Sequence, residues 1–283
     1  MPRLKTFVKW SGNKSRSLKH ILPKIPEFET YYEPFLGSGA VFLSLAPQKW
    51  VVNDVNPDLY ALWQTLASGP EARRFMKCFN DFACVLAGMH KTELLETCKE
   101  LTQTLNTSRA SLKRSVLYLI MKSLVYNGHL YFKDKFKFYT FDLNIHTYAD
   151  IYLFSQKYAD NLRAVCAFLQ NSSSSSVHNK DYTDVLKSCK KGDFVFLDPP
   201  YVEDHDYQFV YNKEEKLDDR FLLDLRKQVE KLDKKKVKWL MTQADTPRIR
   251  HLFGNYFITE FPVYRMPKKK FVKELFVSNY DTR

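Results

Sequence analysis

Residues 31–45 read YYEPFLGSGAVFLSL, and this stretch decides the fold. Its aromatic start, Tyr31–Phe35, suits a short strand, Gly37 and Gly39 mark a turn, and the apolar run Ala40–Leu45 predicts a helix. Glycines placed between a strand and a helix let a ligand approach the backbone closely. The third glycine of the dinucleotide-binding fingerprint is absent, so a plain turn fits the motif equally well. In either interpretation the stretch predicts an α/β fold.

A second short strand, Val51–Val52, ends at Asn53-Asp54, and a helix begins near Pro57. In α/β folds an acidic residue at this point commonly accepts hydrogen bonds from ribose hydroxyls. Asp54 also stands where a cap for the helix at Pro57 is expected, and taken alone the local sequence favours the cap. Both interpretations place Asp54 just beyond the carboxyl end of a strand.

The middle of the chain changes character. Residues 70–127 show helical periodicity and no strand pattern. Residues 129–141 then follow a period of two, which predicts a strand or hairpin with aromatic side chains on one face and lysines on the other. The block interrupts the α/β pattern, so it indicates an inserted domain. The alternating residues are Phe132, Lys133, Lys135, Phe136, Lys137 and Phe138.

The α/β pattern returns in the C-terminal half. A helix at about 148–169 and a serine-rich loop at 172–176 precede the apolar strand Phe194–Leu197. An amphipathic helix is predicted at 218–232. Three further strands are predicted, the last two as a terminal hairpin: Val237–Thr242, Phe257–Tyr264 and Glu274–Asn279.

The tetrapeptide Asp198-Pro199-Pro200-Tyr201 directly follows the apolar strand Phe194–Leu197. It therefore lies at the carboxyl end of a strand, where open α/β sheets bind their ligands. Two prolines in series remove two amide donors, which leaves a carboxylate, backbone carbonyls and an aromatic ring. The exocyclic NH2 group of a nucleobase donates two hydrogen bonds and matches this set. The other interpretation is a strand-end turn with a surface tyrosine.

Such a site can activate a weak nucleophile. The N6 lone pair of adenine is delocalised into the ring, and two acceptors, the Asp198 carboxylate and the Pro199 carbonyl, would draw the nitrogen towards a tetrahedral geometry. The lone pair then becomes available for in-line attack on a methyl sulfonium, helped by fixed dipoles and by the alignment of both reactants. Tyr201 is predicted to stack on the extruded base.

Composition narrows the class of protein. The chain has 283 residues, of which 45% are hydrophobic, and its net charge of +12 favours polyanionic partners. No apolar run approaches the roughly 20 residues of a membrane span, and Met1–Trp10 lacks the apolar stretch of a signal peptide. An intracellular, soluble protein without membrane partners is expected. The five cysteines show neither C-x-x-C nor zinc spacing, so no metal site is predicted.

Four motifs resemble those of the Dam-type (alpha-class, D12) DNA adenine N6-methyltransferase family. They are KWSGNK (9–14), EPFLGSG (33–39), NDVNPDL (53–59) and LDPPY (197–201), in the family's order. The resemblance implies an S-adenosylmethionine-dependent methyltransferase (Rossmann-like) sheet of seven strands, mainly parallel with one antiparallel strand. It also implies a helical and β-hairpin target-recognition domain inserted after the second strand.

The same resemblance implies an activity and partners. We expect a site-specific enzyme that transfers a methyl group from S-adenosyl-L-methionine to N6 of a flipped-out adenine in double-stranded DNA. The catalytic domain is expected at 1–56 and 145–283, and the recognition insertion at 57–144. A monomer or weak dimer is expected. In a restriction-modification setting, the cognate restriction endonuclease would act independently.

The resemblance also assigns residues. The catalytic set is Asp198, Pro199, Pro200 and Tyr201. Trp10, Lys14, Asp54 and Asp198 match cofactor-binding positions, and Asp181 lies near a further acidic one. The strand and glycine turn at 31–39 complete the expected cofactor site. Glu33 is expected at the amino-acid end of the cofactor, and the other residues are Phe35, Gly37 and Gly39.

Expected DNA contacts come from three segments. Lys9 matches a family lysine at the first base pair, and Tyr126-Asn127 match a segment whose aromatic residue wedges into the duplex beside the flipped base. Core packing at a helix end is the other interpretation of Tyr126. The lysines of the predicted hairpin suit phosphate contacts, which give affinity without sequence information. They are Lys133, Lys135 and Lys137.

The sequence departs from the family pattern at Tyr131, in the hairpin stretch Lys133–Phe138, which replaces an N-P-x-G-like segment, and in the first motif. Tyr131 stands where the family carries an arginine that reads a guanine, and tyrosine lacks the bidentate fork for guanine O6 and N7. GATC is the family's commonest site, so the sequence predicts a GATC-like site with a changed second half. Asn13 replaces a glycine of the first motif and must accept that glycine's backbone geometry.

Two alternatives remain. One keeps the fold and changes the substrate to RNA or to cytosine N4, since D-P-P-Y chemistry suits any exocyclic amine. The other is a catalytically inactive DNA-binding homologue. The order of the motifs and Tyr126-Asn127 favour adenine in DNA, and the intact Asp198, Pro199 and Tyr201 argue against an inactive homologue.

Overall fold

The computed structural model describes residues 4–125, 128, 130–132, 139–141, 155–172, 175–201, 219–265 and 270–282. They form two compact units. The helical unit comprises the described residues of 1–13 and 56–173, and the sheet unit those of 14–55, 174–205 and 216–283. Several predicted DNA contacts lie outside the described residues, namely Tyr126, Asn127, Lys133, Lys135 and Lys137.

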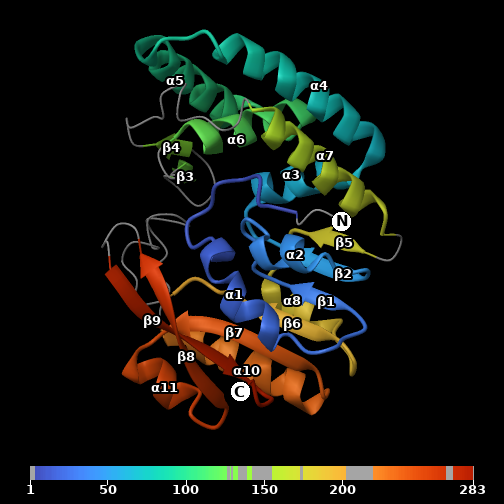
Figure 1. Ribbon diagram of the computed structural model, residues 1–283, viewed down its shortest axis with the longest axis vertical. Helices are drawn as coiled ribbons and strands as arrows, with labels where there is room; N and C mark the ends of the chain where they lie inside the picture. The colour runs from blue at the N-terminus through green and yellow to red at the C-terminus, as the bar shows by residue number, and fades with distance from the viewer. Residues whose placement is uncertain are drawn as a thin grey trace. The chain divides into compact units, whose positions relative to one another are not determined.

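A mixed seven-stranded sheet organises the sheet unit (Figure 1). Its strand order is β5-β2-β1-β6-β7-β9-β8. All pairs are parallel except β7–β9 and β8–β9, so β9 runs against both of its neighbours. This confirms the predicted α/β sheet with one antiparallel strand. The strands are β1 Tyr31–Glu33, β2 Trp50–Asn53, β5 Ser176–His178, β6 Phe194–Leu197, β7 Lys238–Ala244, β8 Phe257–Arg265 and β9 Lys270–Ser278.

The register of the parallel strands brings the sequence motifs to one edge. Tyr31 of β1 pairs with Trp50 of β2 and with Phe194 of β6. The three strands therefore end side by side, because parallel strands with aligned starts and similar lengths share their carboxyl edge. Open α/β sheets bind ligands at this edge.

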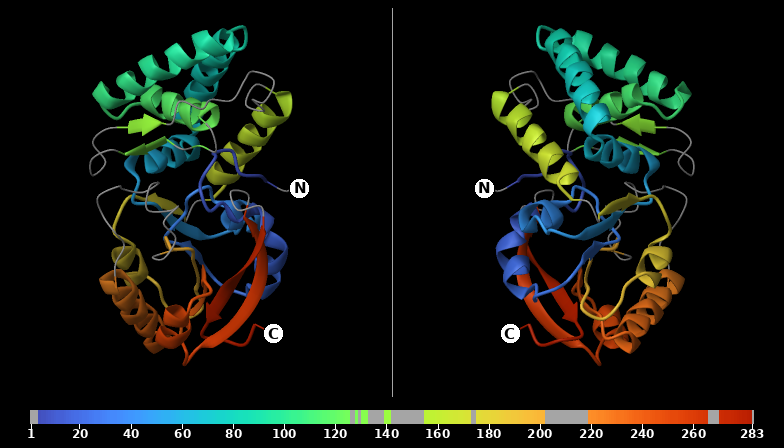
Figure 2. Two further views of the ribbon diagram at one scale, coloured as in Figure 1. Left: turned by 90° about the vertical axis from the view of Figure 1, so that its left-hand side faces the viewer. Right: turned by 90° about the vertical axis from the view of Figure 1, so that its right-hand side faces the viewer.

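Short helices flank the two faces of this sheet (Figure 2). On one face, α8, α10 and α11 enclose a buried cluster that includes Val195, Trp239 and Met241. On the other face, Phe42 of α2 stacks on Tyr31 with ring centroids 6.3 Å apart. The helical segments are η1 Lys14–Arg16, α1 Leu18–Ile21, η2 Leu22–Lys24, α2 Ala40–Leu45, α8 Tyr182–Lys187, α10 Asp219–Lys234 and α11 Pro247–Leu252.

In the helical unit, α6 packs against α3, α4 and α5. Every residue of α6 from Ser115 to Leu124 is buried, so this helix forms the centre of the unit. None of the helices in the described part of the chain combines the length and apolar character that a membrane crossing requires. The elements are α3 Pro57–Ala67, α4 Gly69–Leu86, α5 Lys91–Thr107, α6 Leu112–Leu124, α7 Gln156–Gln170 and the antiparallel strands β3 Leu130–Phe132 and β4 Tyr139–Phe141.

The predicted elements agree with the structure except at a few places. The antiparallel β3–β4 pair confirms the predicted hairpin pairing. The prediction of a loop through Ser176 is wrong at its end, because Ser176 begins β5, which pairs with β2. A strand of three residues after a serine run carries too little periodicity to be recognised from sequence.

The N-terminal segment and α7 belong to the helical unit. The Tyr158 hydroxyl donates to the Phe7 carbonyl at 2.7 Å, and the Phe7 ring lies 4.8 Å from that of Trp63. These compact units therefore divide the chain differently from the expected functional domains. The functional division into 1–56 with 145–283 and 57–144 stays a prediction.

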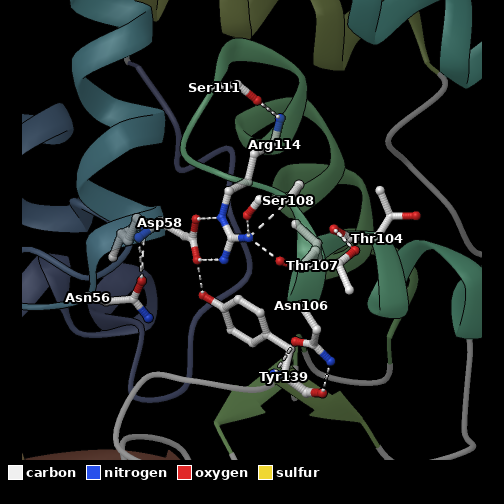
Figure 3. A network of polar contacts seen from close by, with 11 residues as sticks. Asn56, Asp58, Thr104, Asn106, Thr107, Ser108, Ser111, Arg114 and Tyr139 are labelled. Atoms are coloured by element: carbon white, nitrogen blue, oxygen red, sulfur yellow. Dashed lines mark hydrogen bonds and ion pairs between the residues drawn. The ribbon is translucent and has the colours of Figure 1, made fainter.

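The ion pair between Asp58 and Arg114, with its hydrogen-bond partners, connects several elements of the helical unit (Figure 3). The Asp58 carboxylate, at the start of α3, accepts from Arg114 Nε at 2.5 Å and Nη2 at 2.8 Å, and from the Tyr139 hydroxyl at 2.7 Å. Arg114 also donates to the carbonyls of Leu105 and Ser108 at the end of α5. One guanidinium thus links α3, α5, α6 and β4, and Asp58 is 5% exposed.

We predict that Asp58→Ala destabilises the helical unit by about 3–5 kcal/mol, because it leaves the Arg114 charge without its buried partner. Urea unfolding followed by circular dichroism measures this. Glu96→Ala, which removes an exposed ion pair with Lys99 on α5, is the matched control and should change stability by less than about 1 kcal/mol. Equal effects of the two substitutions would contradict the assigned role.

Candidate active site

Two neighbours fix the carboxylate of Asp198. Lys14 Nζ lies 2.7 Å from Oδ1, and the Thr242 hydroxyl of β7 donates to the same oxygen at 2.7 Å. No described residue donates to Oδ2. The side chain is 19% exposed. The carboxylate at the end of β6 is therefore oriented through one oxygen, while the other can accept from a further donor.

Tyr201 is buried, with 2% of its surface exposed. Its hydroxyl donates to Glu274 Oε2 of β9 at 3.0 Å, and Lys14 Nζ lies 5.2 Å from the ring centroid. The interpretation of D-P-P-Y as a turn with a surface tyrosine is therefore wrong. Lys14 contacts both Asp198 and Tyr201, so the two ends of the motif share one cation.

Glu33, at the end of β1, is also buried. Its Oε2 accepts from the Tyr31 hydroxyl at 2.7 Å and from the Phe42 amide at 3.1 Å. Burial raises the pKa of Glu33 to about 8, the hydrogen bond from Tyr31 opposes that rise, and the nearby charge of Asp198 adds to it. Burial therefore favours the protonated form of Glu33 at neutral pH.

The glycine turn after β1 is fastened to the end of β2. Gly37 and Gly39 take positive φ angles of 50° and 64°, which only glycine adopts without strain. The Gly37 amide donates to Asp54 Oδ2 at 2.9 Å. Asn56, whose side chain accepts from the amides of Asp58 and Leu59, caps α3 instead. The interpretation of Asp54 as the helix cap is therefore wrong.

Phe35 and Asp181 make structural contacts. The Phe35 ring lies 5.0 Å from that of Tyr182 and packs against the apolar cluster of the sheet unit. Asp181 is exposed and caps α8 by accepting from the amide and hydroxyl of Thr183. A cofactor contact of either residue stays a prediction.

The remaining described candidates belong to the helical unit. Lys9 Nζ donates to the Ser123 carbonyl near the end of α6 at 2.8 Å, so this bond fixes the position of the amine. Trp10 lies over Lys122, with Nζ 4.5 Å from its ring centroid. Tyr131 is in β3, where its backbone pairs with Thr140.

Asn13 does not adopt the positive φ angle predicted for it as the replacement of a glycine. Gly12 takes the positive φ angle of this segment, 77°, and Asn13 does not. The Asn13 side chain instead donates to the Thr6 hydroxyl at 3.4 Å. The substitution in the first motif is therefore compatible with its backbone.

Sequence reasoning missed three polar side chains that the structure places beside the predicted ones. They are Thr242, Glu274 and Lys122, and each is at most 3% exposed. Thr242 follows an apolar run of β7, whereas Glu274 and Lys122 stand directly beside other polar residues, so the local sequence does not distinguish them. Among the described residues, no group of three or more His, Cys, Asp or Glu side chains is arranged to hold a metal ion.

Comparison with known proteins agrees with the geometry. The model of the "D12 class N6 adenine-specific DNA methyltransferase" family matches residues 10–266. Type II methyltransferase M1.LlaDCHI of Lactococcus lactis subsp. cremoris is 25% identical over 292 residues, 98% of this chain and 96% of that protein.

Two further relatives cover less of their own length. The DNA adenine methylase of Escherichia coli (strain K12) is 24% identical over 205 residues, which cover 71% of this chain and 66% of that protein. The DNA N-6-adenine-methyltransferase of Escherichia phage P1 is 26% identical over 265 residues, which cover 88% of this chain and 31% of that protein.

The raised pKa of Glu33 predicts a pH dependence of stability. Between the ordinary pKa of 4.5 and about 8, unfolding releases the proton that folded Glu33 retains. The free energy of unfolding should therefore fall as pH rises through this window, by up to about 1.4 kcal/mol per pH unit, and become level above it. Urea titrations from pH 5 to 9 should show a flatter profile for Glu33→Gln. Parallel profiles of the two proteins would contradict the buried, protonated state.

The contact between Tyr201 and Glu274 makes a second prediction. Tyr201→Phe removes the hydroxyl from a buried carboxylate and should lower the free energy of unfolding by about 1–3 kcal/mol. Tyr264→Phe, at an exposed position of β8, is the control and should be nearly neutral. Thermal unfolding of both variants measures the difference, and similar melting temperatures would argue against a structural role for the hydroxyl.

Proposed function

Because the chain belongs to the D12 class N6 adenine-specific DNA methyltransferase family, we propose that it is a site-specific DNA-methyltransferase (adenine-specific) that uses S-adenosylmethionine and acts on a flipped-out adenine in double-stranded DNA. The observation that carries the proposal is the Asp198 carboxylate at the end of β6. Lys14 and Thr242 hold one of its oxygens, and no described residue donates to the other.

Asp198 and Pro199 supply the two acceptors that an exocyclic amine needs. Asp198 Oδ2 would accept one N6 hydrogen and the Pro199 carbonyl the other, which makes the nitrogen lone pair available. Because Lys14 and Thr242 already orient the carboxylate, little reorganisation is needed when positive charge develops on N6. Pro200 keeps the segment stiff and offers no competing amide donor.

Tyr201 is proposed to stack on the extruded base. Its ring is attached to the backbone at one end and held by Glu274 at the other, so the direction of its long axis is set before the base enters. At 2% exposure, the ring becomes accessible to a base only when the groups that cover it move. Stacking then offsets part of the few kcal/mol that base flipping costs.

The charges of the sheet unit fit a cationic cofactor. When bound, S-adenosylmethionine supplies an electrophilic methyl group on a positively charged sulfur. The carboxyl groups of Glu33 and Asp198 lie close enough to interact electrostatically, and the Lys14 amine lies beside both of them. The bond from Gly37 to Asp54 fixes the glycine turn at the same edge. We propose that Lys14, Glu33, Asp54 and the turn at Gly37 hold the cofactor, and that Trp10 is a further contact.

A bound cation beside Glu33 would favour its ionised form. We therefore propose that cofactor binding releases the Glu33 proton, which adds a counter-charge only when the cofactor is present. Of the other positions, Phe35 and Asp181 support this site through their packing and capping contacts.

DNA recognition is proposed for Lys9, Tyr126, Asn127, Tyr131 and the lysines of the hairpin. The relatives named DNA adenine methylase support DNA as the substrate. Since Tyr131 replaces the guanine-reading arginine, we propose a GATC-like site that differs from GATC in its second half.

The proposal is tested by methyl transfer from labelled cofactor to duplex DNA, single-stranded RNA and duplexes that lack adenine. Label is expected in N6-methyladenine of duplex DNA alone. Label in RNA or in N4-methylcytosine would overturn the assigned substrate.

Asp198→Asn is expected to lower kcat at least about 100-fold, because it weakens the acceptor on the reacting nitrogen. Binding of duplex DNA, measured by fluorescence anisotropy, should change little. Asp184→Asn, which removes an equal charge from an exposed pair with Lys187 on α8, is the matched control and should retain full turnover. Unimpaired methylation by Asp198→Asn would refute the role of the carboxylate.

A further inference from the structure

Lys122 is a fully buried lysine inside the central helix of the helical unit. It lies on α6 and is 1% exposed. Its ammonium group donates to the Gly128 carbonyl at 2.6 Å and lies 4.5 Å from the centroid of the Trp10 ring. A charge removed from water is stable only when polar or π partners surround it, so these contacts are requirements of the fold.

A second lysine, Lys9, contacts α6 from the N-terminal segment. Its Nζ donates to the Ser123 carbonyl near the C-terminal end of α6 at 2.8 Å. The two lysines thus connect the N-terminal segment, the end of α6 and the turn at Gly128. We call Lys9, Trp10, Lys122, Ser123 and Gly128 the Lys122 cluster.

Close backbone packing joins two parts of this cluster. Gly128 has a φ angle of 70°, and a Cβ atom there would lie 2.9 Å from the Lys9 carbonyl oxygen. Only glycine fits both the angle and the space. The turn that follows Tyr126-Asn127 is therefore pressed directly against the backbone that carries Trp10.

The Lys122 cluster includes a residue proposed to bind the cofactor and a residue next to the segment proposed to bind DNA. Trp10 is a proposed cofactor contact, and Gly128 directly follows the proposed DNA-wedging segment. We propose that Lys122 is a positioning residue whose buried ammonium group holds Trp10 and the Gly128 turn together, and thereby links cofactor affinity to DNA affinity. This inference rests on the proposed function.

The two affinities are linked because both ligands restrict the motion of the same cluster. A ligand that immobilises Trp10 restricts the cluster, so a second ligand that needs the Gly128 turn in place loses less conformational freedom when it binds. The coupling is reciprocal, since each ligand must raise the affinity for the other by the same factor. Without the ammonium group, Trp10 and the turn lose the side chain that both of them contact, and the coupling between them weakens.

The test is a binding cycle with S-adenosylhomocysteine, which carries no transferable methyl group, and an adenine-containing duplex of the substrate sequence. DNA affinity is measured with and without saturating S-adenosylhomocysteine, and the ratio is the coupling factor. For the natural protein we expect a factor of about five or more. Lys122→Met, which keeps an unbranched apolar side chain and removes the ammonium group, should reduce the factor to less than about two.

Lys113→Met is the matched control, because Lys113 is an exposed lysine on the same helix. It removes the same charge and should leave the coupling factor unchanged. A merely structural role of Lys122 would lower both affinities and the melting temperature while keeping the ratio. Tryptophan fluorescence gives a second readout: loss of the ammonium group should shift the emission of the protein, and the shift should vanish in a Trp10→Phe background.

A second pair of variants changes the cluster at Gly128 instead of Lys122. This pair tests the inference if Lys122→Met does not fold. Gly128→Ala forces a Cβ atom against Lys9 and should also reduce the coupling factor. Gly88→Ala is its control, because a Cβ atom there meets nothing within 4 Å.

The outcomes separate the inference from the proposed function. If the natural protein binds both ligands with a factor near one, or if Lys122→Met keeps the natural factor, the inference is overturned and the proposed function stands. If the natural protein binds neither ligand, the proposed function itself fails and takes the inference with it.

Discussion

The contact between Lys14 and Asp198 is the interaction on which the candidate site depends. Parallel pairing of β1, β2 and β6 brings three strand ends to one edge, and the lysine then orients the carboxylate that follows β6. A carboxylate held through one oxygen by a buried cation keeps its other oxygen for a ligand. The same amine lies beside the Tyr201 ring, so the position of one side chain affects both ends of the D-P-P-Y motif.

Burial determines how the other groups act. Glu33 is removed from water, which raises its pKa, whereas Asp54 accepts from the Gly37 amide and fixes the glycine turn. Tyr201 and Lys122 are equally buried, and each is held by a polar partner on another element. The polar groups thus define the geometry of the site, and the apolar cluster behind β6 and β7 keeps it in place.

Much of this arrangement could be predicted from local sequence. The glycine turn, the apolar strand before Asp198 and the terminal hairpin each carry their signal within ten residues or so, and the structure places them as expected. Residues whose role depends on tertiary contacts could not be predicted. Thr242 and Glu274 lie more than forty residues from the motif they contact, and the choice of Asn56 over Asp54 as helix cap depended on where β2 ends.

Asp198 is proposed to accept a hydrogen bond from the amine of an extruded adenine. A crystal structure of the protein with S-adenosylhomocysteine and a duplex containing its methylation site tests this most directly. We expect adenine N6 within about 3 Å of Asp198 Oδ2 and of the Pro199 carbonyl oxygen, with the base against the Tyr201 ring. An adenine bound elsewhere, with no contact between its amine and Asp198, would contradict it.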